Sequence, residues 1–337
     1  MKKILFLHGF FATGSCPMAR ALKEAFEGTA VVLTPDLPLH PKEALKEIRS
    51  IIDREQPDLL LGNSCGSFLA QMLAPVVGIP ALLAVLCVAP AWATALLLAA
   101  LSVIAAHELL TAVSGPDKAR RWTVLPALCG VLLLGRQVFS WPGLEWLLLA
   151  AALTLPLSGV LTYGKPQALT FTDVCAMAAA GFAIPWAFSG LYGLRMLEGG
   201  YLLVLTPLVA AFCSDALALF TGMALGRHKL APLVSPHKTV EGAAGGLVGG
   251  MAGMAIFCLV YRAITGVNLG LPLCVALGLL GALLGELGDL SFSAVKRQYG
   301  IKDYGRLLPG HGGVLDRFDS VLFAAPVLCA LLRALAA

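Results

Sequence analysis

The strongest constraint on the fold is a succession of long apolar segments that occupies the chain from about residue 75 onward. Hydrophobic residues make up 58% of the chain and charged residues only 13%, which excludes a disordered chain and an ordinary soluble enzyme. Two of these segments, 76–89 and 124–139, are short for a hydrocarbon core about 30 Å thick. We therefore expect a mainly α-helical, polytopic membrane protein with about nine transmembrane helices. The nine candidate segments are 76–89, 91–109, 124–139, 144–161, 173–192, 201–223, 243–261, 271–290 and 318–335.

The amino-terminal part of the chain has a different character. Residues 1–83 carry eight Lys or Arg and eight Asp or Glu, whereas residues 84–337 carry sixteen and twelve in about three times the length. Short apolar runs alternate with helical patterns in this first part, and such a βαβ order predicts a parallel sheet. We therefore expect a small truncated α/β module at 1–83 and a membrane-embedded domain at 84–337.

Basic residues gather in alternate loops of the membrane-embedded part, at 107–123, 224–240 and 291–317. Loops rich in Lys and Arg stay on the cytoplasmic side of a membrane. We therefore expect a multi-pass protein of the inner (cytoplasmic) membrane, with its polar loops and active site facing the cytoplasm.

The densest polar stretch lies between the last two apolar segments and includes Asp316 and Asp319. Just before it, Glu286 and Asp289 stand three residues apart on an otherwise apolar helix, so they share one face. A carboxylate within a membrane helix is costly to insert and is a functional candidate for that reason. The basic members of this stretch are Lys296, Arg297, Lys302 and Arg317.

A second polar group surrounds Asp215, the lone charge within the apolar segment 201–223. Basic and small residues follow it at 226–229 and 235–242. Carboxylates hold Mg²⁺, which commonly binds substrate phosphates as well, and Lys and Arg neutralise further phosphate charge. The two groups together predict a site for a phosphate-bearing substrate. The simpler alternatives are a solvated loop that only orients the protein and an Asp215 that only hydrogen-bonds a neighbouring helix.

Residues 293–319 resemble the signature of the phosphatidate cytidylyltransferases (CDP-diacylglycerol synthases) at each defining position. The run from Ser235 to Gly242 is similar to a second family block, SPKKTWEG, and departs from it at His237 and Val240. Asp215 falls where the family has SDTGAY, of which only Ser214 and Asp215 are kept. The resemblance covers residues 84–337.

This resemblance implies the transfer of CMP from CTP to phosphatidic acid, with Mg²⁺ and a monovalent cation such as K⁺. It places the metal at Asp289 and Asp316, with Asp319 nearby. The positions that it places near the nucleotide and phosphates are Asp215, Lys229, Ser235, Lys238 and Glu241.

The expected chemistry needs no protein nucleophile. A phosphatidate oxygen attacks the α-phosphorus of CTP, and pyrophosphate leaves. Lys296, Arg297, Lys302 and Arg317 are candidates to offset the phosphate charge. His311 lies in a glycine-rich turn, and either proton transfer or a structural hydrogen bond would suit it. The expected partners are CTP, phosphatidic acid and the lipid bilayer, without nucleic acid, and a homodimer remains open.

The amino-terminal module carries a motif of its own. Residues 62–66 fit the G-x-S-x-G nucleophile elbow, and residues 1–83 resemble the front of an esterase-type α/β-hydrolase with Ser64 as nucleophile. The acid and the histidine of such a triad follow the serine in the chain, whereas His8 and His40 both precede it. We interpret the module as a truncated hydrolase remnant without esterase activity.

Two other classes of function remain as alternatives. An ion-coupled membrane transporter would use Asp215, Glu286 and Asp289 along an ion path. A membrane-tethered serine esterase would act through Ser64 and would cleave esters without CTP. Metal-dependent consumption of CTP separates the first hypothesis from both.

Overall fold

The structure is a computed structural model that describes residues 2–7, 17–37, 41–62, 82–139, 141, 143–305 and 312–336. The chain divides into two compact units, with the division between Leu82 and Leu83. The boundary predicted from the sequence, after residue 83, lies one residue from this division. Each unit is described by itself below.

The amino-terminal unit contains a three-stranded parallel sheet with β1 between its two neighbours, so the predicted parallel sheet is confirmed. Leu5 and Leu7 of β1 are buried against Ala44 and Ile48 of the second helix, which form one face because they lie four residues apart. Ser64, His8 and His40 lie outside the described residues, so the nucleophile-elbow hypothesis remains a prediction. The elements of this unit are β1 (Lys2–Leu7), α1 (Pro17–Ala25), β2 (Ala30–Leu33), α2 (Pro41–Glu55) and β3 (Leu59–Gly62).

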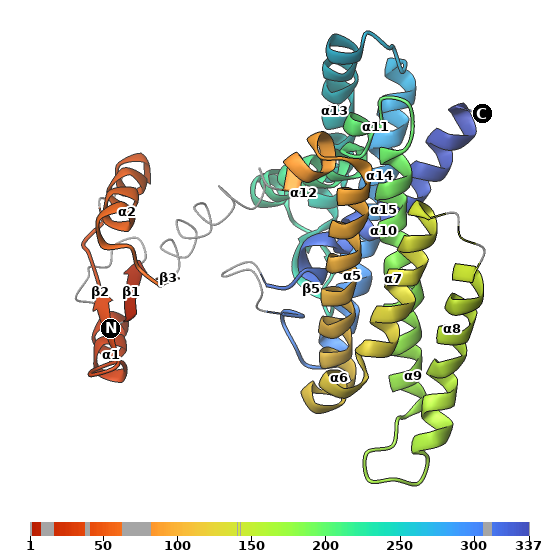
Figure 1. Ribbon diagram of the computed structural model, residues 1–337. Helices are drawn as coiled ribbons and strands as arrows, with labels where there is room; N and C mark the ends of the chain where they lie inside the picture. The colour runs from red at the N-terminus through yellow and green to blue at the C-terminus, as the bar shows by residue number, and fades with distance from the viewer. Residues whose placement is uncertain are drawn as a thin grey trace. The chain divides into compact units, whose positions relative to one another are not determined.

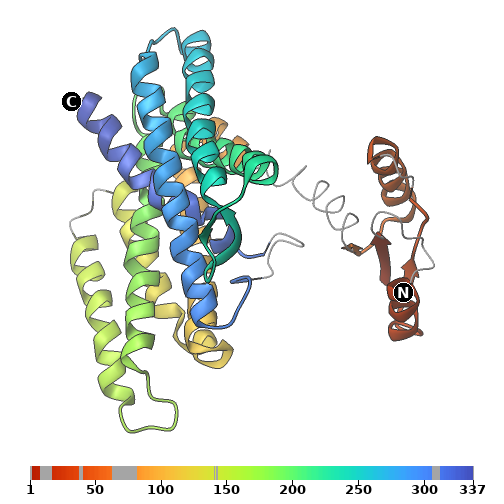
Figure 2. The ribbon, with the colours of Figure 1, turned by 180° about the vertical axis from the view of Figure 1, so that it is seen from behind.

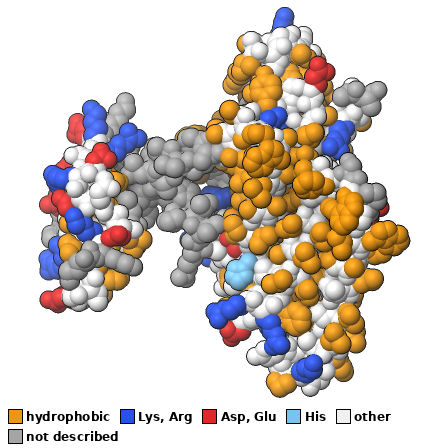
Figure 3. Space-filling model, in the orientation of Figure 1, with side chains coloured by type: hydrophobic (Ala, Val, Ile, Leu, Met, Phe, Trp, Pro, Cys, Tyr) orange, Lys and Arg blue, Asp and Glu red, His pale blue; other side chains and the backbone are white. Residues whose placement is uncertain are grey.

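The second unit is a bundle of helices with one small hairpin (Figure 1). Hydrophobic side chains cover much of the face seen in Figure 3, as expected for helices in contact with lipid. The elements are η1 (Ala84–Val88), α5 (Ala91–Ser114), α6 (Pro116–Trp122), α7 (Val124–Val138), α8 (Gly143–Thr162), α9 (Phe171–Ala178), η2 (Ala179–Ala183), α10 (Ile184–Arg195), α11 (Gly200–Leu203), α12 (Thr206–Leu225), β4 (Lys229–Ala231), β5 (Ser235–Thr239), α13 (Val240–Thr265), α14 (Leu271–Gln298) and α15 (Leu315–Ala336).

Seven helices within the described residues are long and apolar enough to cross a membrane, so the polytopic helical class is confirmed and the count of nine is not. The segment 124–139 forms α7, which has 15 residues and falls below that length. Residues 76–81 of the first predicted segment lie outside the described residues, and its described part contains the five-residue π-helical turn η1. This turn ends at Ala89, which is extended because Pro90 follows it.

The glycine-rich start of α13 packs closely against its neighbours. A Cβ built on Gly249 would come within 2.7 Å of Leu217 Cβ of α12, and one on Gly278 of α14 within 2.9 Å of the Gly250 carbonyl carbon. Small residues allow helix backbones to approach in this way. The packing brings the polar side chains of α12 and α14 near one another.

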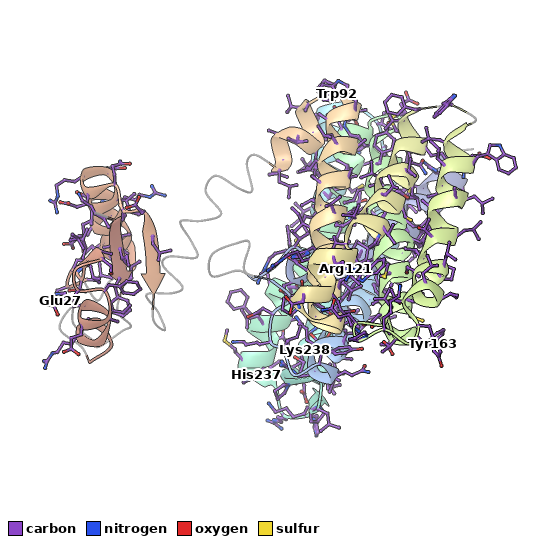
Figure 4. The ribbon with its side chains drawn as sticks, turned by 60° about the horizontal axis from the view of Figure 1, so that its bottom comes forward. Glu27, Trp92, Arg121, Tyr163, His237 and Lys238 are labelled. Carbon is purple, nitrogen blue, oxygen red and sulfur yellow. The ribbon has the colours of Figure 1, made fainter. Side chains whose placement is uncertain are left out.

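The basic loops follow the carboxyl ends of α5, α12 and α14 and therefore lie toward the same end of the bundle. Figure 4 shows Trp92 near the amino end of α5, while Lys238 and His237 of the hairpin lie toward the other end. The hairpin β4–β5 is antiparallel and connects α12 to α13. Figure 2, the view from behind, shows it beside α14. This arrangement places the hairpin next to the charged residues of α14.

Candidate active site

Lys238 of β5 connects the hairpin to two acidic residues of α14. Its ammonium Nζ lies 2.8 Å from Glu286 Oε1 and 2.6 Å from Asp289 Oδ2. The two carboxylates can share one cation because residues three apart on a helix face the same way. One turn further along, Ser293 Oγ donates a hydrogen bond to Asp289 Oδ1 at 3.1 Å. The predicted common face of Glu286 and Asp289 is thus confirmed.

Glu286 and Asp289 stabilise the positive charge of Lys238. Burial lowers the pKa of an ammonium, but Asp289 and Glu286 outweigh this effect and hold the pKa of Lys238 above its ordinary value. Lys238 is therefore positively charged throughout the neutral pH range and is suited to bind an anion such as a phosphate.

Two further carboxylates belong to the same cluster. Asp215 of α12 interacts electrostatically with Lys238, Asp289 and Glu286. Asp319 of α15 interacts with Asp289 and Asp215, is buried, and accepts the Ser320 amide N–H through Oδ1 at 2.7 Å. We call Asp215, Glu286, Asp289 and Asp319 the acidic cluster. Because four carboxylates repel one another in a low-dielectric interior, their charges need cations nearby.

Asp316 of α15 forms a separate buried ion pair with Lys296 of α14. The Nζ to Oδ1 distance is 2.9 Å, and the two side chains are 4% and 11% exposed, respectively. Asp316 Oδ2 accepts the backbone N–H groups of Tyr304 at 2.8 Å and Gly313 at 2.9 Å. Gly312, just before, has φ 78°, a left-handed conformation that favours glycine. We call residues 299–314, which connect α14 to α15, the signature loop. Asp316 contacts both described ends of this loop.

A cavity of about 480 Å³ opens beside Lys238. One part of its wall is polar and includes Asp215, Lys238 and Glu286. Another part is apolar and includes Leu219 and Met223, which are exposed on α12. The cavity thus joins a charged surface to an apolar one, as binding of a lipid with a phosphate headgroup requires.

Other residues predicted for the site hold the hairpin in place. Glu241 accepts the backbone N–H groups of Arg227 at 3.0 Å and His228 at 3.2 Å, and it lies 2.6 Å from His228 Nδ1. Arg297 Nε of α14 donates to the Val234 carbonyl oxygen at 3.1 Å. These contacts fix the hairpin against α13 and α14, and a direct role of Glu241 or Arg297 toward a nucleotide stays a prediction.

The structure also describes the positions of most of the remaining predicted residues. Ser235 and Lys229 lie on the hairpin strands, and Lys229 is exposed, as is Lys302. Arg317 on α15 interacts electrostatically with Asp215. His311 lies outside the described residues. Five residues of the predicted set thus lie close enough for electrostatic interaction with Asp215 or Asp319 or both: Asp215, Lys238, Asp289, Asp319 and Arg317.

The acidic cluster suits a hard divalent cation by its chemistry. Carboxylate oxygens are the ligands that Mg²⁺ prefers, and the Lys238 ammonium already takes a cation's place between Glu286 and Asp289. Among the residues that the structure describes, no three His, Cys, Asp or Glu side chains stand at ligand spacing for one metal ion. To bind a metal ion through both oxygens, Asp316 would have to leave three partners, Lys296 and two backbone N–H groups. Asp289 would have to leave two, Lys238 and Ser293.

Two buried acidic residues were not predicted from the sequence. Glu108 of α5 is 6% exposed and accepts the backbone N–H groups of Val314 and Leu315, both at 2.9 Å. Asp173 of α9 pairs with Lys118 of α6 at 2.7 Å. Glu108 could have been found by the argument used for Asp215, because it is the single acidic residue of the apolar segment 91–109.

The fold and the site define a polytopic helical membrane protein with acidic and basic side chains that meet at one end of the bundle. The model of the cytidylyltransferase family matches residues 70–335, and the chain belongs to this family. The phosphatidate cytidylyltransferase of Bacillus subtilis (strain 168) is 36% identical over 249 residues, 70% of this chain and 87% of its own. That of Staphylococcus aureus (strain COL) is 32% identical over 268 residues, 78% and 97% of the two chains. The predicted family is confirmed.

A second family model matches the amino-terminal part of the chain. It is described as an uncharacterised protein family and covers residues 3–100. The match spans the described parallel sheet and is consistent with the esterase-like fragment predicted there.

Proposed function

We propose that this protein transfers CMP from CTP to phosphatidic acid, forming CDP-diacylglycerol and pyrophosphate. The observation that carries the proposal is that Asp215, Asp289 and Asp319, from three different helices, interact electrostatically with one another, and that Lys238 of the hairpin pairs with Asp289. The reaction must bring two phosphate-bearing anions into contact, so it needs bound cations on both. Relatives named phosphatidate cytidylyltransferase support this reading.

We further propose that Asp215, Asp289 and Asp319 are the residues that would hold Mg²⁺ when CTP is bound. This requires the three carboxylates to move closer together, because among the described residues no three stand at ligand spacing. The ion would act there as a Lewis acid that lowers the negative charge on the reacting phosphates. Asp316 as a metal ligand stays a prediction, because it requires the release of Lys296 and of backbone N–H groups. A bound K⁺ also stays a prediction.

The chain's own basic residues then orient the two anions. Lys238 stays charged at neutral pH and lines the cavity, so it is placed to bind a phosphate. Arg317 adds positive charge near Asp215. In the step itself a phosphatidate oxygen forms a bond to the α-phosphorus of CTP, and the bond from that phosphorus to pyrophosphate breaks. These cations lower the repulsion between attacking and leaving oxygens.

The cavity suggests how the lipid approaches. Its apolar wall at Leu219 and Met223 is continuous with the exposed apolar surface of α12, where the acyl chains would lie. The basic loops at this end of the bundle support an orientation with the site at the cytoplasmic face of the inner membrane. A homodimer stays a prediction that sizing in detergent tests.

The test uses purified full-length protein in detergent, phosphatidic acid and CTP labelled at the α- or the γ-phosphate. We expect the α-label to enter lipid and the γ-label to appear in pyrophosphate, both only when Mg²⁺ is present. Folded protein that leaves both labels in CTP would refute the proposal, and CTP hydrolysis without labelled lipid would redirect it to another reaction. A transporter would consume no CTP under these conditions.

A further inference from the structure

A carboxylate of the first long helix lies against the start of the last one. Glu108 Oε1 accepts the Val314 N–H and Oε2 accepts the Leu315 N–H, each at 2.9 Å. The first N–H groups of a helix have no partner within it, and they carry its partial positive charge. Glu108 therefore caps α15 from a helix more than 200 residues earlier in the chain.

Both described ends of the signature loop lie close to this carboxylate. A Cβ on Gly305 or on Gly313 would overlap Glu108 Oε1. Gly312 has a positive φ, but Gly305 and Gly313 do not, so their own backbone conformations do not require glycine. The presence of glycine at these two positions is explained by the space that Glu108 occupies.

Glu108 and Asp316 together hold three successive N–H groups. Asp316 accepts that of Gly313, and Glu108 accepts those of Val314 and Leu315. The next helical turn carries Asp319, which belongs to the acidic cluster. A rotation or shift of the first turn of α15 would therefore displace Asp319 relative to Asp289 of α14.

We propose that Glu108 is a positioning residue of the cytidylyl transfer: it sets the start of α15, and through it the place of Asp319, without touching substrate. This inference rests on the proposed function. A displacement of about 1 Å in a reacting arrangement can lower a rate on the order of a hundredfold. Loss of the Glu108 carboxylate should thus reduce turnover by each folded molecule, whereas a merely structural role would reduce only the yield and the melting temperature.

The first experiment compares Glu108→Gln with wild type and with the control Glu145→Gln. Glutamine keeps the size of the side chain, but its NH₂ group faces one of the two N–H donors. Glu145 is exposed and pairs with Arg136 at 2.7 Å, away from the site. With turnover normalised to folded protein, we expect kcat for Glu108→Gln to fall about 10- to 100-fold, with KM for CTP nearly unchanged and the control at wild-type kcat. Wild-type kcat in Glu108→Gln would overturn the inference.

A second set of variants tests the positioning role of Glu108 even if Glu108→Gln does not fold. Gly313→Ala should lose turnover because its methyl group meets the carboxylate, and adding Glu108→Asp should restore part of it by shortening the side chain. Full activity of Gly313→Ala, or an equal loss with and without Glu108→Asp, would overturn the inference. Failure of the proposed function is distinct, because wild-type protein would then form no CDP-diacylglycerol.

Discussion

The buried pair of Lys296 and Asp316 gives a quantitative test of how the signature loop is held. Lys296→Met removes the ammonium and leaves the Asp316 carboxylate, 4% exposed, with only two backbone donors. Removing one partner of a buried ion pair costs about 3–5 kcal/mol. Because two N–H groups still bind Asp316, we expect the lower end, about 3 kcal/mol. With about 2.1 cal/mol/K of unfolding entropy per residue, a chain of 337 residues would then have a melting temperature lower by roughly 4 °C.

The assay is thermal unfolding of purified protein in detergent, followed by intrinsic fluorescence. Lys302→Met is the matched control, since Lys302 is exposed and its loss should change stability by no more than about 0.5 kcal/mol. The double variant Lys296→Met/Asp316→Asn should recover part of the loss, because no unpaired charge is left. A melting temperature of Lys296→Met within about 1 °C of the control would refute the reasoning, since it would correspond to less than about 1 kcal/mol.

Three further predictions concern the site and the amino-terminal unit. Asp319→Asn should lower kcat by at least about a hundredfold, the usual scale for loss of a group that stabilises transition-state charge, while the protein remains folded by circular dichroism; near-normal turnover would contradict its place in the acidic cluster. The pKa of Lys238 is raised above its ordinary value, so the stability of its ion pairs is fully present at lower pH and is lost only as the pH rises through that higher pKa. The melting temperatures of wild type and Lys238→Met should therefore not converge as the pH rises from 6 to 9, and convergence in that interval would show a lowered pKa instead. Ser64 should remain unlabelled by a fluorophosphonate probe, and rapid labelling would reveal an active serine nucleophile.

Part of the site could be predicted because it depends on the spacing of residues within one helix. Glu286 and Asp289 were expected to share a face from their spacing, and they do so by holding one lysine. The glycine run of α13 likewise follows a local rule, because small residues let α12 approach closely at Gly249. Most of the long apolar helices among the described residues were expected from the length of the apolar segments.

What the sequence did not reveal depends on contacts between distant segments. Glu108 lies more than 200 residues from the N–H groups that it caps, and no periodicity relates the two positions. The engagement of both Asp316 oxygens likewise depends on how the loop returns to α14. The count of nine spans is not confirmed, because apolar composition alone does not reveal helix length: among the described residues α7 has 15 residues, and η1 ends before Pro90.

The central claim is that carboxylates from separate helices hold a divalent cation where CTP binds. The most direct measurement is the binding of Mn²⁺, used in place of Mg²⁺ and followed by electron paramagnetic resonance, to the purified protein with CTP and without lipid. The account predicts that CTP strengthens Mn²⁺ binding by wild type and by Glu145→Gln, and that Asp289→Asn abolishes this binding. Equal binding of Mn²⁺ by wild type and Asp289→Asn would contradict it.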